Sequence, residues 1–157
     1  MARGGLTVQD IVLQIVPVRD QRIVEQLRYW TDEKLLIPLR GTGRGTGNYR
    51  EYGEETVWRA LLLCRLAWRG ASLDEMKAVA ELLDAMNTEE RKLWELAKRS
   101  PDCEVYVTVP PAGIGTARIF KGLEQLQAHF KRMKQWPAVL VVNLGATFDW
   151  NRRLRPK

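Results

Sequence analysis

Residues 39–52, with the sequence LRGTGRGTGNYREY, constrain the fold more than any other stretch of the chain. Four glycines alternate along it, and arginine stands at positions 40, 44 and 50. Glycine adopts backbone conformations that other residues avoid, so it suits tight turns and close approach between backbones. The pattern predicts a β-hairpin with a glycine-rich tip and with tyrosines and Arg50 on the returning strand. Such a tip suits the backbone or minor groove of DNA; the alternative is a solvated connector whose arginines only aid solubility.

The same stretch lacks the two glycine-rich signatures of nucleotide-binding proteins. A phosphate-binding loop ends in Gly-Lys-Ser/Thr, whereas Asn48 and Tyr49 follow the last glycine here. A dinucleotide fingerprint placed on this stretch would have Thr46 or Asn48 where its third glycine is required. One histidine, no nucleophile elbow and no metal-ligand spacing lead us to expect no enzyme, no cofactor and no metal site.

The distribution of charge says more than the net charge of +6. Residues 1–73 carry 11 Lys and Arg against 8 Asp and Glu, residues 74–104 carry 5 against 9, and residues 105–157 carry 9 against 2. The chain is therefore basic, acidic and basic in turn, and the basic ends favour acidic partners. No apolar run reaches the roughly 18 residues of a membrane span, and no signal peptide is apparent, so we expect a cytoplasmic protein without a membrane partner.

Two short amphipathic helices are predicted before the glycine-rich stretch. Thr7 can cap the first and Pro17 ends it, and Asp20 can cap the second. Their apolar residues recur at helical spacing: Val8, Ile11, Val12 and Ile15, then Ile23, Val24, Leu27 and Trp30. Two such helices joined by a turn outline a helix-turn-helix. The other side of the second helix carries side chains able to contact bases or phosphates, namely Gln21, Arg22, Gln26, Arg28 and Tyr29, although a merely solvated face has the same composition.

Three further helices and a change of character follow. We expect helices over residues 54–70, 72–86 and 88–100, the second with a capping box between Ser72 and Glu75. In the last of these helices, Leu93, Trp94, Leu96 and Ala97 are expected to need a partner surface. Residues 103–109 predict a half-buried strand, residues 119–133 a helix whose apolar face begins at Ile119, and residues 138–144 a buried strand. Strand, helix and strand predict a βαβ unit that packs on the helices, on a partner subunit or on a third strand, for which residues 146–150 are the candidate.

Taken in order, four motifs resemble the MerR family of bacterial transcription regulators. They are LRYW at residues 27–30, LLIP at residues 35–38, YREY at residues 49–52 and RGASLDEMK at residues 69–77. The resemblance covers roughly the first 85 residues. It implies a mainly α winged helix-turn-helix with a β-hairpin wing at residues 1–85 and a connecting, dimerising helix at residues 86–100. A small α+β module at residues 101–157 lies beyond it.

The resemblance implies a dimer on near-palindromic double-stranded DNA, with the recognition helix in the major groove and the wing on the backbone. Arg28 and Tyr29 fall at the DNA-facing end of the recognition helix, and Tyr49 and Arg50 fall in the wing. Arg44 is assigned to the wing tip on physical grounds, and Lys34 and Arg40 are weaker candidates for backbone contacts. Promoter binding would make the protein nucleoid-associated and RNA polymerase a further partner.

Two departures from the family pattern are visible. The turn between the first two helices is longer than usual, and the paired cysteines and cysteine cluster of metal-sensing and iron-sulfur members are absent. The basic module at residues 101–157 has three open interpretations: dimerisation and packing, added DNA contacts chiefly from the tail NRRLRPK, or a site for an acidic effector. A protein-interaction adaptor that docks through the acidic middle helices is the alternative to a DNA-binding regulator.

Overall fold

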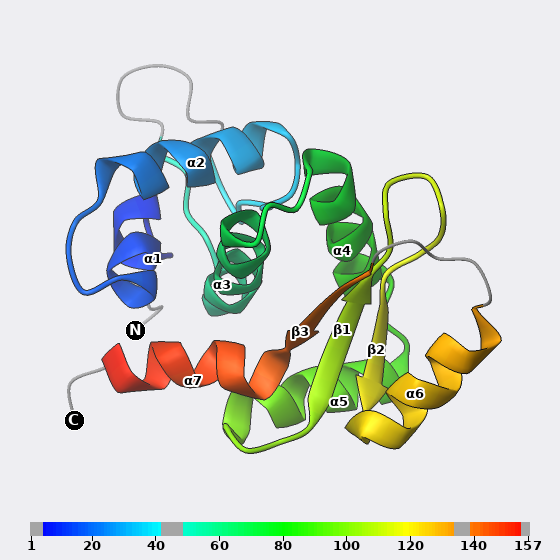
Figure 1. The fold of residues 1–157 in the computed structure, drawn as a ribbon. Coiled ribbons are helices and arrows are strands. Elements are labelled where there is room, and N and C mark those ends of the chain that lie inside the picture. The colour runs from blue at the N-terminus through cyan, green and yellow to red at the C-terminus, as the bar shows by residue number, and fades with distance from the viewer. Residues whose placement is uncertain (1–4, 42–48, 134–138, 155–157) are drawn as a thin grey trace. The chain divides into compact units, whose positions relative to one another are not determined.

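The structure is a computed structural model that describes residues 5–41, 49–133 and 139–154, with side chains up to Asp149 in the last helix. The chain divides into two compact units. Unit 1 comprises residues 1–61 and 150–157, and unit 2 comprises residues 62–149. The helices and strands of each unit are labelled in Figure 1.

Unit 1 begins with the two expected helices, α1 (Val8–Ile15) and α2 (Gln21–Asp32), and ends in the first part of α3 (Glu54–Trp68). Thr7 caps α1 in a full capping box, because its hydroxyl accepts from the Asp10 N–H and the Asp10 carboxylate accepts from the Thr7 N–H. The pKa of Asp10 is lowered by a hydrogen bond that the Thr7 hydroxyl donates to its carboxylate and by the bond from the Thr7 N–H. Asp20 caps α2, and the predicted apolar stripes of both helices form the core, with Leu27 and Trp30 almost completely buried.

A small antiparallel arrangement completes unit 1. Leu6 pairs with Tyr52 through two backbone hydrogen bonds of 2.8 Å, and Arg40 pairs with Glu51. The returning segment at residues 51–52 therefore lies between the start of the chain and the segment that leaves α2. The expected glycine-rich tip, with Arg44, lies outside the described residues.

Unit 2 holds the remainder of α3, then α4 (Leu73–Ala85) and α5 (Thr88–Arg99). The predicted capping box of α4 is present, with the Glu75 N–H donating to the Ser72 hydroxyl and the Ser72 N–H to the Glu75 carboxylate. Asn87 caps α5 in the same way with Glu90. Gly70, with φ of +82°, ends the α3 region as expected.

A three-stranded antiparallel sheet follows, formed by β1 (Val105–Val109), β2 (Arg118–Lys121) and β3 (Leu140–Asn143) in the order β2-β1-β3 (Figure 1). Helix α6 (Gly122–Arg132) connects β2 to β3, and α7 (Leu144–Leu154) follows β3. Both outer strands run antiparallel to β1 and thus parallel to one another, so β2, α6 and β3 make a split βαβ unit around the central strand. Helices α4 and α5 contact β1, and α6 contacts β1 and β2.

Four expectations for residues 101–157 are wrong. The helix expected from Ile119 starts only at Gly122, because residues 118–121 pair with β1 in register Val107–Ile119. The two expected strands, β1 and β3, do not form the expected βαβ unit with one another, because the extra reversal at β2 makes β3 run antiparallel to β1. The third strand is β2 and not residues 146–150, which belong to α7. The expected burial of the two strands is also reversed. The strand expected to be half-buried, β1, is central and buried on both faces, including Thr108, whereas the strand expected to be buried, β3, is a partly exposed edge strand.

The expected need of α5 for a partner surface is also wrong for two of its four residues. Trp94 and Ala97 are buried within the chain itself, at 1% and 0% exposure. The Trp94 ring meets the Phe148 ring of α7 edge to face, with centroids 4.9 Å apart. Leu96 is 38% exposed and is the apolar residue of that set that faces outward most.

Candidate nucleic-acid interface

The outward side of α2 carries the residues predicted for the recognition helix. Gln21, Arg22, Arg28 and Tyr29 are exposed, and Gln26 is half-buried. Tyr29 leaves half of its surface, 50%, in solvent although its neighbour Trp30 is buried. Among these side chains, the Gln21 amide donates to the Glu25 carboxylate at 3.2 Å. The helix thus presents a polar, basic and aromatic surface of the composition that contacts bases and phosphates.

The turn before α2 is longer than two or three residues, as its sequence indicated. Helix α1 ends with the Val16 N–H donating to the Val12 carbonyl, and α2 begins after Asp20. The Arg19 guanidinium donates back to the Gln9 side chain of α1. This contact holds the turn against the first helix.

Helix α2 ends in a tight left-handed turn at Lys34, whose φ is +62°. The Leu35 N–H donates to the Trp30 carbonyl at 2.8 Å and the Lys34 N–H to the Thr31 carbonyl. Leu35 and Leu36 then enter the core, while Lys34 stays exposed. The turn therefore leaves the Lys34 side chain in solvent directly beyond the exposed side of α2.

The structure describes the base of the predicted wing, and residues 42–48 lie outside the described residues. Arg40 is exposed and Tyr49 is 79% exposed, so both predicted contacts are accessible there. Gly41 has φ of +83°, and a Cβ at this position would lie 2.1 Å from the Tyr49 carbonyl oxygen. Only glycine allows this approach of the two segments.

Arg50 is placed differently from the other predicted residues. Its side chain is 19% exposed, and its Nη2 donates to the Asp32 Oδ1 at the end of α2 at 2.5 Å. This hydrogen bond raises the pKa of Arg50, burial opposes the increase, and the charge of Asp32 and the nearby Tyr52 add to it. Arg50 therefore ties the segment at residues 49–52 to the end of α2.

Three residues of this arrangement were missed by sequence reasoning: Thr31, Asp32 and Tyr52. The Thr31 hydroxyl donates to the Leu27 carbonyl at 2.9 Å and lies 2.9 Å from the Tyr52 hydroxyl. The one available signal was Tyr52, which stands two residues after Arg50 and so shares its side of an extended segment. Nothing in the sequence indicates that the last residues of α2 meet the returning segment of the wing.

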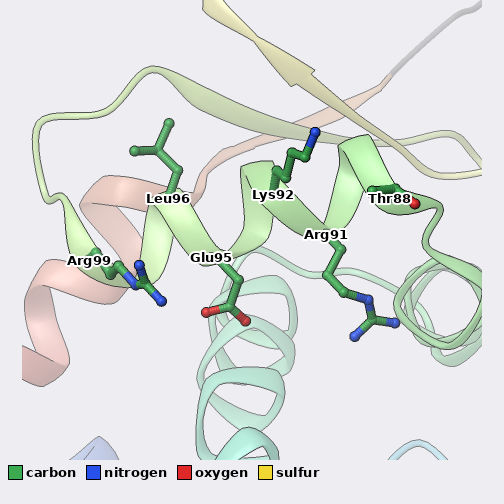
Figure 2. Close-up of a pocket in the computed structure, with 6 residues that line it drawn as sticks. All are labelled: Thr88, Arg91, Lys92, Glu95, Leu96 and Arg99. Atoms are coloured by element: carbon green, nitrogen blue, oxygen red, sulfur yellow. The ribbon is translucent and has the colours of Figure 1, made fainter.

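A second surface lies along α5 in unit 2. A shallow hollow of about 410 Å³ is lined by six residues of this one helix: Thr88, Arg91, Lys92, Glu95, Leu96 and Arg99. We call this set the α5 stripe. Figure 2 shows Lys92 and Leu96 pointing to one side of the helix and Arg91 and Glu95 to the other. Ion pairs within the helix join Lys92 to Glu89 and Lys98 to Glu95.

The remaining features bear on metal binding, membrane spanning and the titration of single side chains. The Cys64 thiol is buried, and burial raises its pKa to about 12. Across the described ranges, no three His, Cys, Asp or Glu side chains are grouped so that they could hold a metal ion. In the same ranges no helix has both the length and the apolar character needed to cross a membrane. His129 lies against the Phe120 ring, with centroids 4.6 Å apart, and burial together with Arg118 and Arg132 lowers its pKa.

Comparison with known proteins finds a similarity over residues 24–83. No curated protein sequence matches the chain. Residues 24–83 match the family model described as MerR HTH family regulatory protein, which covers most of α2, the wing, α3 and most of α4. Residues 24–83 of this chain are therefore similar to the helix-turn-helix region of the MerR family of regulatory proteins.

Proposed function

We propose that the protein is a sequence-specific transcription regulator that binds promoter DNA as a dimer. The observation that carries the proposal is the outward side of α2, which is polar, basic and aromatic in a domain of MerR type. A helix with this surface fits the major groove, where side chains can distinguish base pairs. In a cell we expect the protein in the cytoplasm at the nucleoid, with RNA polymerase as a further partner at the promoter.

The two parts of the interface have different tasks in this proposal. Arg28 and Tyr29 contact base edges, and Gln21, Arg22 and Gln26 contact bases or the flanking phosphates. Around the wing, Arg40, Arg44, Tyr49 and Arg50 hold the DNA backbone, with Lys34 beside them. Backbone contacts supply affinity for any sequence, whereas contacts to base edges supply discrimination.

The α5 stripe is the proposed dimer contact, because its residues complement one another in an antiparallel pair. If two copies of α5 cross with their centres together, Lys92 lies at the level of Glu95 of the second copy, and Thr88 at the level of Arg99. The opposite charges of Lys92 and Glu95 then meet twice across the two-fold axis. Such a dimer requires an operator with matching near-palindromic symmetry.

The first test is a fluorescence-anisotropy titration of the full chain against DNA from upstream of its own gene and against a scrambled duplex, at two salt concentrations. A regulator binds the upstream DNA more tightly, and the preference persists at the higher salt. Equal and steeply salt-sensitive binding to both duplexes would contradict the proposal. In that case the adaptor, which docks through the acidic residues of α4 and α5, becomes the better explanation.

Arg28→Ala separates base contacts from backbone contacts within the same titration. We expect it to reduce the preference for the operator by about 1–3 kcal/mol, the usual value of a bidentate base contact. Arg40→Ala is the matched control, since it should weaken binding to both duplexes alike and lower the salt slope by about one unit. Equal losses on both duplexes for Arg28→Ala would show that Arg28 holds only phosphate.

A further inference from the structure

A chain of hydrogen bonds joins the interior of the recognition helix to the base of the wing. Because the Thr31 hydroxyl donates its one proton to the Leu27 carbonyl, the Tyr52 hydroxyl must be the donor in its 2.9 Å contact with Thr31. The Tyr52 oxygen then remains an acceptor, and Tyr52 is among the groups that raise the pKa of Arg50. Tyr52 thus connects the surroundings of the Arg50 guanidinium to the core of the domain.

On its solvent side, the Arg50 guanidinium is held by a very different group. Tyr52 and Thr31 are buried, at 1% and 8% exposure, whereas the Asp32 side chain is 64% exposed. The Asp32 carboxylate therefore lies at the surface, between the end of α2 and the wing, and holds Arg50 from the solvent side. A second oxyanion that approached from solvent would compete with this carboxylate for the same N–H groups.

We propose that Asp32 is an internal substitute for a DNA phosphate, which occupies Arg50 in the free protein and lowers the affinity for DNA. The inference rests on the proposed function. When DNA binds, a backbone phosphate replaces the carboxylate on Arg50, while Tyr52 and Thr31 keep the guanidinium in position. Asp32 thus sets how strongly the wing holds DNA of any sequence, and it leaves discrimination to the outward side of α2.

The magnitudes support exchange over a permanent pair. Because most of the Asp32 side chain lies in solvent, its ion pair with Arg50 is only weakly held, and one well-placed phosphate can displace the carboxylate. Arginine pairs with phosphate through two parallel N–H bonds, which favours the DNA-bound arrangement. The displaced carboxylate also repels nearby phosphates, so its presence opposes binding before and after the exchange.

The test is the anisotropy titration with Asp32→Asn. Because Arg50 then lacks the competing carboxylate, we expect roughly twofold to fivefold tighter binding to both the upstream and the scrambled duplex. The salt slope should become steeper by about one unit. Asp32→Glu, which keeps a carboxylate within reach of Arg50, should behave as the unaltered protein does.

Two further variants show whether the effect acts through Arg50. Glu25→Gln removes the same charge from α2 without touching Arg50, and we expect it to change the affinity less and to leave the slope in place. In an Arg50→Gln background, Asp32→Asn should have no more effect than Glu25→Gln. Asp32 and Glu25 are both exposed, so thermal melts of these variants should match that of the unaltered protein.

The outcomes separate this inference from the proposed function. Weaker binding of Asp32→Asn would overturn the inference, because it would mean that Asp32 only braces the wing for its contact. An effect that equals that of Glu25→Gln, or that persists without Arg50, would overturn it as well. Failure to prefer the upstream duplex would instead contradict the proposed function, and the effect of Asp32 on the scrambled duplex would still be measurable.

Discussion

At the scale of single residues, two left-handed glycines perform different tasks although their backbone angles are nearly the same. Gly41 has φ of +83° and Gly70 has φ of +82°. A Cβ on Gly70 would meet nothing within 4 Å, whereas one on Gly41 would lie 2.1 Å from the Tyr49 carbonyl oxygen. Gly70 is therefore needed only for its conformation, and Gly41 is needed for conformation and space together.

The pair gives a prediction with its own control. Gly70→Ala should lower the free energy of unfolding by about 1 kcal/mol, the cost of a left-handed residue with a Cβ. Gly41→Ala should cost clearly more, since backbone at the base of the wing must also move, and it should weaken DNA binding as well. Urea denaturation measures both losses. If the two variants lost equal free energies of unfolding, the backbone segments at Gly41 and Tyr49 would be able to move apart without cost.

Sequence reasoning succeeded for residues whose role is local and failed for those whose partner is distant. The solvent-facing positions of Arg28 and Tyr29 follow from the 3.6-residue period, which fixes the buried side of α2. Asp32 and Arg50 meet across the fold, and no local pattern records that contact. Their relation was therefore accessible only from the structure.

At the scale of elements, the caps made the helices predictable. Thr7, Asp20 and Ser72 all cap helices where the sequence indicated, because a cap hydrogen bond is made within a few residues. The strand β2 was missed because Ile119 continues an apolar series at helical spacing with Leu123 and Leu126. The break lies at Gly122, with φ of +74°, whose N–H donates to the Glu104 carbonyl at 2.6 Å. Strand pairing and direction depend on such non-local contacts, which the period of the sequence does not encode.

Helix α5 gives the prediction at this scale. Trp94 is buried against Phe148 within one chain, so Trp94→Ala should lower the free energy of unfolding by about 3–5 kcal/mol. Trp68, which is 51% exposed, is the control, and Trp68→Ala should lower the free energy of unfolding by much less. Urea denaturation at two protein concentrations measures both. A loss for Trp94→Ala that appeared only at the concentration where the protein dimerises would contradict burial within the chain.

At the scale of the whole molecule, the property to test is dimer formation. Reversing the charges of Lys92 and Glu95 in the α5 stripe tests it. Lys92→Glu and Glu95→Lys should each weaken the proposed dimer, because like charges then face one another across the axis. Two symmetry-related exposed pairs are worth about 0.4–2 kcal/mol, which is roughly a twofold to thirtyfold change in Kd. The double variant should recover most of the loss. Sedimentation equilibrium measures the dimer Kd, and a double variant as weak as either single one would exclude this register.

The packing of Trp94 on Phe148 has a consequence for synthesis on the ribosome. Roughly 50 residues separate the two rings, and translation at about 5–20 residues per second takes roughly 3–10 s to cover them. During that interval α5 has emerged and its apolar side lacks the ring that later covers it. Nascent chains that pause before α7 therefore expose a tryptophan of the final core, and they are the species that we expect chaperones to bind.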